Sequence, residues 1–133
     1  MGGHQQRRAL RDEGGVCRVR DYVITLDFEI QRPRIGNEQM LPESDRAMWQ
    51  QMSGFIAGHE TQHKNVWQSC AADLDRRVAT LEAATCRDLG AKAEALWQEM
   101  LTSCDALQRS FDDEQARALM QQPFMRHALE AAE

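Results

Sequence analysis

One pentapeptide combines residue types and a spacing that can do chemistry: His59-Glu60-Thr61-Gln62-His63. Two histidines four positions apart lie one above the other on the same helix face, so both imidazoles can reach a single metal ion. The glutamate after the first histidine is then placed to take a proton from a water molecule at that metal. The motif therefore predicts a Zn²⁺ site with His59 and His63 as ligands and Glu60 as the catalytic base.

A long amphipathic helix must position this motif. Apolar residues recur at spacings of three and four from Trp49 to Leu81, and Ser44 or Asp45 can cap the start of the helix. The predicted helix ends near Thr85. Both histidines fall on its apolar stripe, where unpaired polar groups are costly. Zinc is one partner that would satisfy them, and a hydrogen-bonded structural pair is the alternative.

A second apolar stripe runs from Leu89 to Phe111, after a break expected at Cys86–Gly90. Two amphipathic helices joined by a short turn pack antiparallel, because only then are both stripes buried. A short helix to about Gln122 and a final turn or helix from Pro123 complete the chain. The predicted class is α+β, mostly helical, with a long antiparallel helical hairpin packed on a short β segment.

This hairpin also nominates a third zinc ligand, which a catalytic site needs in addition to an open position for water. The extended metzincin pattern is excluded, because its glycine and third histidine would fall at Val66 and Ser69. With the hairpin turn near residue 87, the acidic run Asp112-Asp113-Glu114 lies beside the two histidines. Asp112 is our first choice for the third ligand. The competing interpretation of this run is a helix start that interacts with the helix dipole. The alternative ligands are Asp113, Glu114 and His127.

The four cysteines indicate an oxidising compartment, although a cytosolic protein with four buried thiols is the alternative. Cys70 shares the motif face but lies about 10 Å beyond His63, at about 1.5 Å of rise per residue, which is too far for a common metal. We interpret Cys70 as a disulfide partner of Cys104 or as a buried thiol. Cys17 and Cys86 then remain to pair with each other, and the other connectivities stay open.

A β-rich run begins at Cys17, where apolar and polar residues alternate. It predicts one strand over residues 17–31, bent near Asp21. Residues 1–16 are polar and glycine-rich, so we expect a mobile tail before a single domain at 17–133. A lone strand is not stable, and no second strand is evident. We therefore expect its partner to be missing sequence or another chain, which would give an oligomer.

Composition limits the classes of partner. The chain has 133 residues, of which 42% are hydrophobic and 28% charged, as in a single globular domain. Its net charge of −5 is spread along the sequence, so we expect no nucleic-acid partner. No apolar run is long enough to span a membrane. The first residues lack the apolar segment of a signal peptide, so we expect that segment to be absent from this chain.

The order of these features resembles a known family, the bacterial domain of unknown function 922, described as predicted secreted zinc-dependent proteases. The resemblance extends from residue 17 to about residue 117. The shared features are, in order, a cysteine, a β run, a proline-containing connector, the pair Trp49 and Met52, the HExxH motif, Cys86 and the pair Phe111-Asp112.

The resemblance implies a zincin-like fold, a periplasmic or secreted bacterial location, and a peptidase that acts on peptides or proteins. It assigns His59 and His63 as zinc ligands and Glu60 as the general base. Members of the family usually carry a further N-terminal β segment, which we expect this chain to lack. They also carry a Thr and a His-Gly after the aromatic–Asp pair, where this chain reads Glu114-Gln115-Ala116-Arg117-Ala118. If that histidine is the third ligand in relatives, Asp112 or His127 must replace it here.

Three functions therefore compete. The first is a zinc-dependent metallopeptidase. The second is a non-catalytic zincin-like binding or scaffold protein whose metal site is structural, degenerate or empty. The third is a helical hairpin that binds a partner helix and holds no metal.

Overall fold

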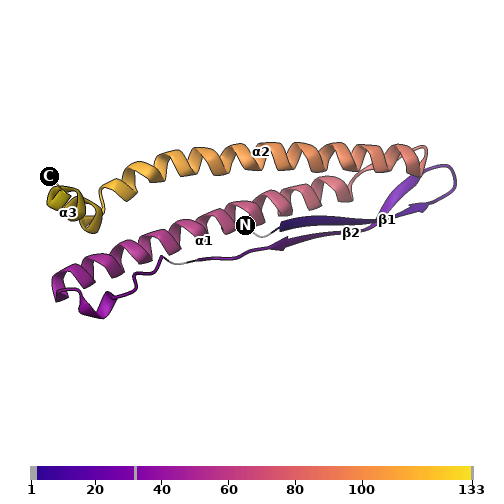
Figure 1. Cartoon of the computed structure of the whole chain (residues 1–133). Coiled ribbons are helices and arrows are strands. Elements are labelled where there is room, and N and C mark those ends of the chain that lie inside the picture. The colour runs from indigo at the N-terminus through magenta and orange to yellow at the C-terminus, as the bar shows by residue number, and fades with distance from the viewer. Residues whose placement is uncertain (1–2, 32, 133) are drawn as a thin grey trace. The chain divides into compact units, whose positions relative to one another are not determined.

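The computed structural model describes residues 3–31 and 33–132. Its three strands form an antiparallel sheet in the order β1-β2-β3. The described chain is α+β and mostly helical, which confirms the predicted class. The elements are β1 (Gly3–Asp12), β2 (Cys17–Asp27), a short 3₁₀ helix η1 (Glu38–Met40), α1 (Glu43–Ala79), β3 (Glu82–Ala83), α2 (Cys86–Met120) and α3 (Pro123–Ala132) (Figure 1).

The chain forms two compact units. The sheet unit comprises Met1–Glu29 and Lys64–Leu107, and the histidine unit comprises Ile30–His63 and Gln108–Glu133. Helices α1 and α2 each contribute one stretch to both units. The HExxH motif and the acidic run that follows Phe111 belong to the same unit.

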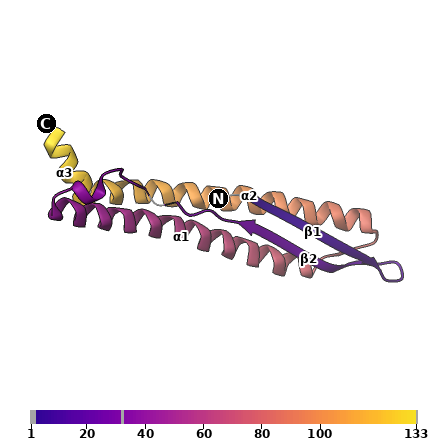
Figure 2. The ribbon, with the colours of Figure 1, turned by 60° about the horizontal axis from the view of Figure 1, so that its bottom comes forward.

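In the sheet unit, the core lies between the sheet and the two helical stretches, which Figure 2 shows running alongside β1 and β2. Alternate residues of β2 pack against this core, as expected for a strand with one buried face. The buried residues of the core are Trp67, Leu74, Val78, Ala93, Trp97, Met100 and Cys104.

A β-bulge keeps the apolar residues of β2 on one face. Ala9 pairs with Asp21 and Leu10 with Val19, so Arg20 is the extra residue. Val19 and Tyr22 are three positions apart, and the bulge brings both to the core side. The bend predicted near Asp21 therefore coincides with an irregularity in the strand pairing.

Strand β1 corrects the prediction of a mobile tail, at least for residues 3–12. It pairs with β2 along its length, so β2 is not an unpaired strand and needs no second chain as partner. Gly14 and Gly15 form the connecting turn with φ of 64° and 95°, a region that side chains disfavour. Sequence periodicity missed β1 because several of its half-buried side chains are polar. Met1 and Gly2 lie outside the described residues.

The element boundaries differ from the prediction in three places. β2 ends at Asp27 rather than at residue 31. α1 ends at Ala79 rather than near Thr85, because Thr85 accepts a hydrogen bond from the Asp88 amide and caps α2. α2 then runs without a break to Met120, so no separate short helix begins after residue 114.

Both predicted disulfides are present. Cys17–Cys86 joins the start of β2 to the start of α2, and Cys70–Cys104 joins α1 to α2. The second bridge and the Arg77–Glu99 ion pair show that the two helices are antiparallel in the sheet unit. No helix in the described ranges combines the length and apolarity needed to cross a membrane.

In the histidine unit, the last helix packs on the start of α1. Buried Trp49 meets Phe124 edge to face, with ring centroids 5.2 Å apart. His127 pairs with Asp45 at 3.4 Å. The helix predicted to begin at Pro123 is confirmed.

A glycine in α1 offers a test of local stability. A methyl group added at Gly58 would meet no atom within 4 Å. We expect Gly58→Ala to raise the free energy of unfolding by about 0.5–1 kcal/mol, because glycine loses more backbone entropy in a helix than alanine. Urea unfolding followed by circular dichroism measures the change. Gly14→Ala should instead destabilise the protein, because Gly14 has a positive φ. An unchanged or lower urea midpoint for Gly58→Ala would contradict the placement of Gly58 in an open position of α1.

A polar network joins β2, β1 and α2 in the sheet unit. Tyr22 donates its hydroxyl proton to Gln6 Oε1 at 2.9 Å. Gln6 Nε2 donates to Glu94 Oε2 at 2.7 Å, and Arg8 pairs with the same carboxylate at 3.1 Å. Burial raises the pKa of Tyr22 to about 12, with Arg8 opposing the rise and Glu94 adding to it.

Tyr22 is the one tyrosine in the chain, so tyrosinate absorbance reports its titration directly. We expect a midpoint near 12 in the folded protein, and near 10 in denaturant. Because the folded pKa is the higher one, the stability linked to Tyr22 is complete below about pH 10 and is lost as the pH rises further. A rapid pH jump monitored also by circular dichroism separates titration from unfolding. A folded midpoint near 10 would contradict the burial of this hydroxyl.

Candidate metal centre

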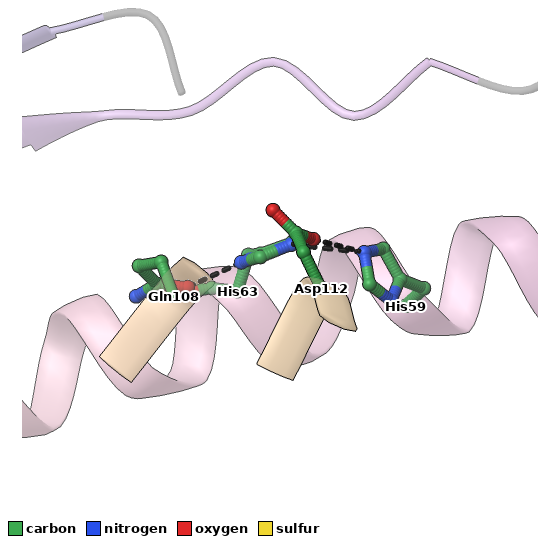
Figure 3. A network of polar contacts seen from close by, with 4 residues as sticks. All are labelled: His59, His63, Gln108 and Asp112. Atoms are coloured by element: carbon green, nitrogen blue, oxygen red, sulfur yellow. Dashed lines mark hydrogen bonds and ion pairs between the residues drawn. The ribbon is translucent and has the colours of Figure 1, made fainter. Parts of the chain in front are cut away.

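Three potential ligand atoms converge in the histidine unit (Figure 3). His59 and His63 come from α1, and Asp112 comes from α2. Asp112 Oδ1 lies 2.8 Å from His59 Nε2 and 2.6 Å from His63 Nε2, and the two Nε2 atoms are 2.9 Å apart. An Nε2 atom without a proton is a lone-pair donor, as is a carboxylate oxygen. Such atoms repel at these distances unless a proton or a cation lies among them.

Gln108 determines which nitrogen of His63 faces this cluster. Its side chain is buried, and Gln108 Nε2 donates to the backbone oxygen of His63 at 3.3 Å. The amide oxygen must then face the ring, where it contacts His63 Nδ1. Because an amide oxygen only accepts hydrogen bonds, Nδ1 carries the proton and Nε2 of the neutral ring keeps its lone pair. His63 is thus held in the tautomer that a metal bound through Nε2 requires.

An aromatic ring orients the other imidazole. Phe111 stacks on His59 with centroids 4.7 Å apart and planes 11° from parallel. The same ring meets the edge of His63 at 5.1 Å. His59 Nδ1 is buried and has no hydrogen-bond partner within the described residues. Stacking on Phe111 therefore fixes the plane of the His59 ring, whereas the hydrogen bond to Gln108 fixes both the orientation and the tautomer of His63.

The charge of the cluster is supplied by Asp112. Burial opposes ionisation of its carboxyl, but the hydrogen bonds with His63 and His59 outweigh burial and hold the pKa of Asp112 below its ordinary value. Its side chain is 55% exposed, against 16% for His59 and 18% for His63. The cluster is therefore enclosed by protein around the imidazoles and open to solvent at the carboxylate.

Glu60 lies next to this cluster, where it lines a cavity together with His59 and Asp112. Its side chain is partly exposed. Within residues 3–31 and 33–132, its carboxylate makes no hydrogen bond or ion pair. Glu60 is therefore not committed to a structural contact that would compete with proton transfer.

The other predicted candidates lie apart from the cluster. Asp113 and Glu114 are exposed residues in the interior of α2, next to Asp112 in sequence. The interpretation of this acidic run as a helix start is therefore wrong, because α2 begins at Cys86. His127 pairs with Asp45 instead. All four cysteines are in disulfides.

Sequence reasoning missed the role of Gln108. The available signal was its spacing, because Gln108 and Asp112 are one helical turn apart, as are His59 and His63. Two such pairs on facing antiparallel helices can meet residue by residue. Phe111 was noted as part of a motif, but its stacking on His59 was not foreseen.

Residues 5–118 match the family described as bacterial protein of unknown function (DUF922). The chain belongs to this family. The match contains every residue of the cluster as well as Gln108 and Phe111. Comparison with curated proteins found no match, and comparison with solved structures found none either. The description of the family names no activity.

The role of Gln108 can be tested without metal. We expect neutral His63 to carry its proton on Nδ1 in the metal-free protein and to lose this preference in Gln108→Leu, because the accepting amide oxygen is gone. Two-dimensional NMR of the imidazole nitrogens at alkaline pH measures the tautomer. Gln115→Leu, on the same helix, is the control and should leave His63 unchanged. A mixed tautomer in the parent protein would contradict this assignment.

Proposed function

We propose that this DUF922 member is a zinc-dependent metallopeptidase, with His59, His63 and Asp112 as zinc ligands and Glu60 as the general base. The observation that carries the proposal is the convergence of His59 Nε2, His63 Nε2 and Asp112 Oδ1 within 4.8 Å of one another. Two imidazoles and one carboxylate form a donor set that suits a catalytic zinc, since a fourth position stays open.

The donor atoms fit the ion after a small adjustment. Ligand atoms about 2.0–2.1 Å from a tetrahedral zinc lie about 3.3 Å from one another. The three atoms here are 2.6–2.9 Å apart, so they need to separate by about 0.4–0.7 Å to reach that spacing. The partner of His63 Nδ1 is already in place through Gln108.

A zinc ion held by His59, His63 and Asp112 would supply Lewis acidity, which acidifies a bound water molecule and polarises a substrate carbonyl. Glu60 then accepts the proton of the attacking water and delivers it to the nitrogen of the leaving amine. The absence of a hydrogen bond or ion pair from the Glu60 carboxylate to any described residue supports this role. The exposed side of Asp112 leaves a route by which water and a peptide reach the site.

The same donors also resemble the two-histidine, one-carboxylate sites that hold iron in oxygenases. Glu60 favours the hydrolytic assignment, because its position directly after His59 gives the site a base. The two disulfides fit the proposal of an extracellular or periplasmic location, where oxidising conditions preserve them.

Metal content tests the ligand set. We expect about one zinc per chain after incubation with Zn²⁺ and gel filtration, and a loss of zinc in His59→Ala and in Asp112→Asn. His127→Ala and Asp113→Asn are matched controls that should keep the metal, because neither residue belongs to the cluster. Mass spectrometry of the metals gives the stoichiometry and distinguishes zinc from iron. Equal zinc in the site variants and the parent would refute the ligand assignment.

Hydrolysis tests the base. Glu60→Gln should keep its zinc and lose at least about 100-fold in the rate of cleaving an unfolded protein, because an amide cannot accept the proton. Peptide release measured by mass spectrometry follows the reaction. A parent protein that holds zinc but cleaves nothing would support the alternative of a non-catalytic scaffold. Full activity in Glu60→Gln would show that the base is another group.

A further inference from the structure

A cavity of about 300 Å³ adjoins the candidate metal centre inside the histidine unit. His59, Glu60 and Asp112 line it. The rest of its wall is largely apolar, with Phe55 and Ile56 from α1 and Ala116 and Leu119 from α2 among its residues. Its volume is at the lower end of the range for ligand pockets.

The helix period explains why this wall lies beside the centre. Phe55 and Ile56 come one turn before His59 on α1, and Ala116 comes one turn after Asp112 on α2. Because the helices are antiparallel, the turn before the histidines and the turn after the aspartate lie on the same side. The apolar wall and the ligand cluster therefore form one continuous surface.

We propose that this cavity is a specificity pocket for a large apolar side chain next to the scissile bond, such as leucine, methionine or phenylalanine. The proposal rests on the metallopeptidase function proposed above and names the class of its substrates. A peptide bond presented to Glu60 and the metal ligands carries its flanking side chains within a few ångströms of them. The cavity is lined by Glu60 and by two of the three proposed ligands, His59 and Asp112, so a flanking side chain is the substrate group that reaches it.

The chemistry of the wall selects the occupant. Aliphatic and aromatic groups gain free energy by leaving water for an apolar wall, whereas charged side chains would lose their hydration. A negatively charged substrate group would also meet Asp112 and Glu60. Discrimination by such a pocket is moderate, about 10- to 200-fold in kcat/KM for each missing methylene.

The test compares pentapeptides that differ only at the central residue, which is leucine in one and glycine in the other. The first measurement uses zinc-loaded Glu60→Gln protein, so that the peptide binds without being cleaved. We expect the methyl NMR signals of Ile56, Ala116 and Leu119 to shift with the leucine peptide and not with the glycine peptide. The second measurement is kcat/KM for both peptides with the parent protein, expected to favour leucine at least about 10-fold.

A bulky substitution inside the cavity supplies the variant. Ala116→Phe narrows the pocket, so it should remove the methyl shifts of Ile56 and Leu119 and lower kcat/KM for the leucine peptide at least about 10-fold, with little effect on the glycine peptide. Ala106→Phe is the control, since Ala106 is an exposed residue of the same helix that does not line the cavity. An equal loss of kcat/KM for both peptides in Ala116→Phe would mean that the substitution damages the metal centre rather than a specificity pocket. This result would overturn the proposal.

The outcomes separate the two proposals. Cleavage without a preference for leucine, and without shifts in the methyl signals of Ile56, Ala116 and Leu119, would overturn the pocket and leave the peptidase standing. Methyl shifts without cleavage of any peptide would keep an apolar binding pocket and refute the peptidase. The absence of both methyl shifts and cleavage would refute the pocket and the peptidase together.

Discussion

The histidine unit depends on one electrostatic constraint, which is that three lone-pair donors share a small space. His59 Nε2, His63 Nε2 and Asp112 Oδ1 cannot stay within 2.6–2.9 Å of one another without a positive charge or a shared proton. Neighbouring side chains hold both imidazoles in this position, through the amide of Gln108 and the ring of Phe111. Such prior orientation would favour the metal binding proposed above, because the imidazoles would not have to be ordered when an ion binds.

Helix geometry accounts for most of the arrangement. Residues four apart on one helix present side chains at the same level as residues four apart on an antiparallel neighbour. His59 therefore meets Asp112 and His63 meets Gln108 with no irregularity in either helix. The next turn outward gives the apolar wall of the cavity. The ligand cluster and the neighbouring cavity thus arise from successive turns of the same two antiparallel helices.

Much of the fold and of the candidate metal centre was predictable from the sequence. Apolar spacing located α1 and the inward face of the motif, and the hairpin register brought Cys70 to Cys104 and Asp112 to the histidines. β1 was not predicted because its half-buried positions include glutamine and arginine. These side chains pair with Glu94 and do not contribute to an apolar pattern. The Asp-Glu-Gly-Gly stretch before β2 was a turn signal that could have located it.

The remaining errors have a common cause. Acidic residues that follow Phe111 suggested a helix start, but a solvated helix face carries acids equally well, and α2 continues through them. Gln108 was missed because a buried glutamine has no signature in hydrophobic periodicity. Its partner is a side chain far away in sequence, at position 63. Contacts of that kind require the register between helices to be known within one turn.

The amide at position 108 also has a consequence for reactivity. A carboxylate in its place would share negative charge with the imidazole, making the ring a stronger donor and dispersing the charge of a bound cation. A glutamine orients the ring while adding no charge and does not titrate. The donor set then carries one formal negative charge, from Asp112, so a divalent ion would retain a net charge of about +1. For the zinc site proposed here, such a donor set would preserve Lewis acidity rather than maximise the strength of binding.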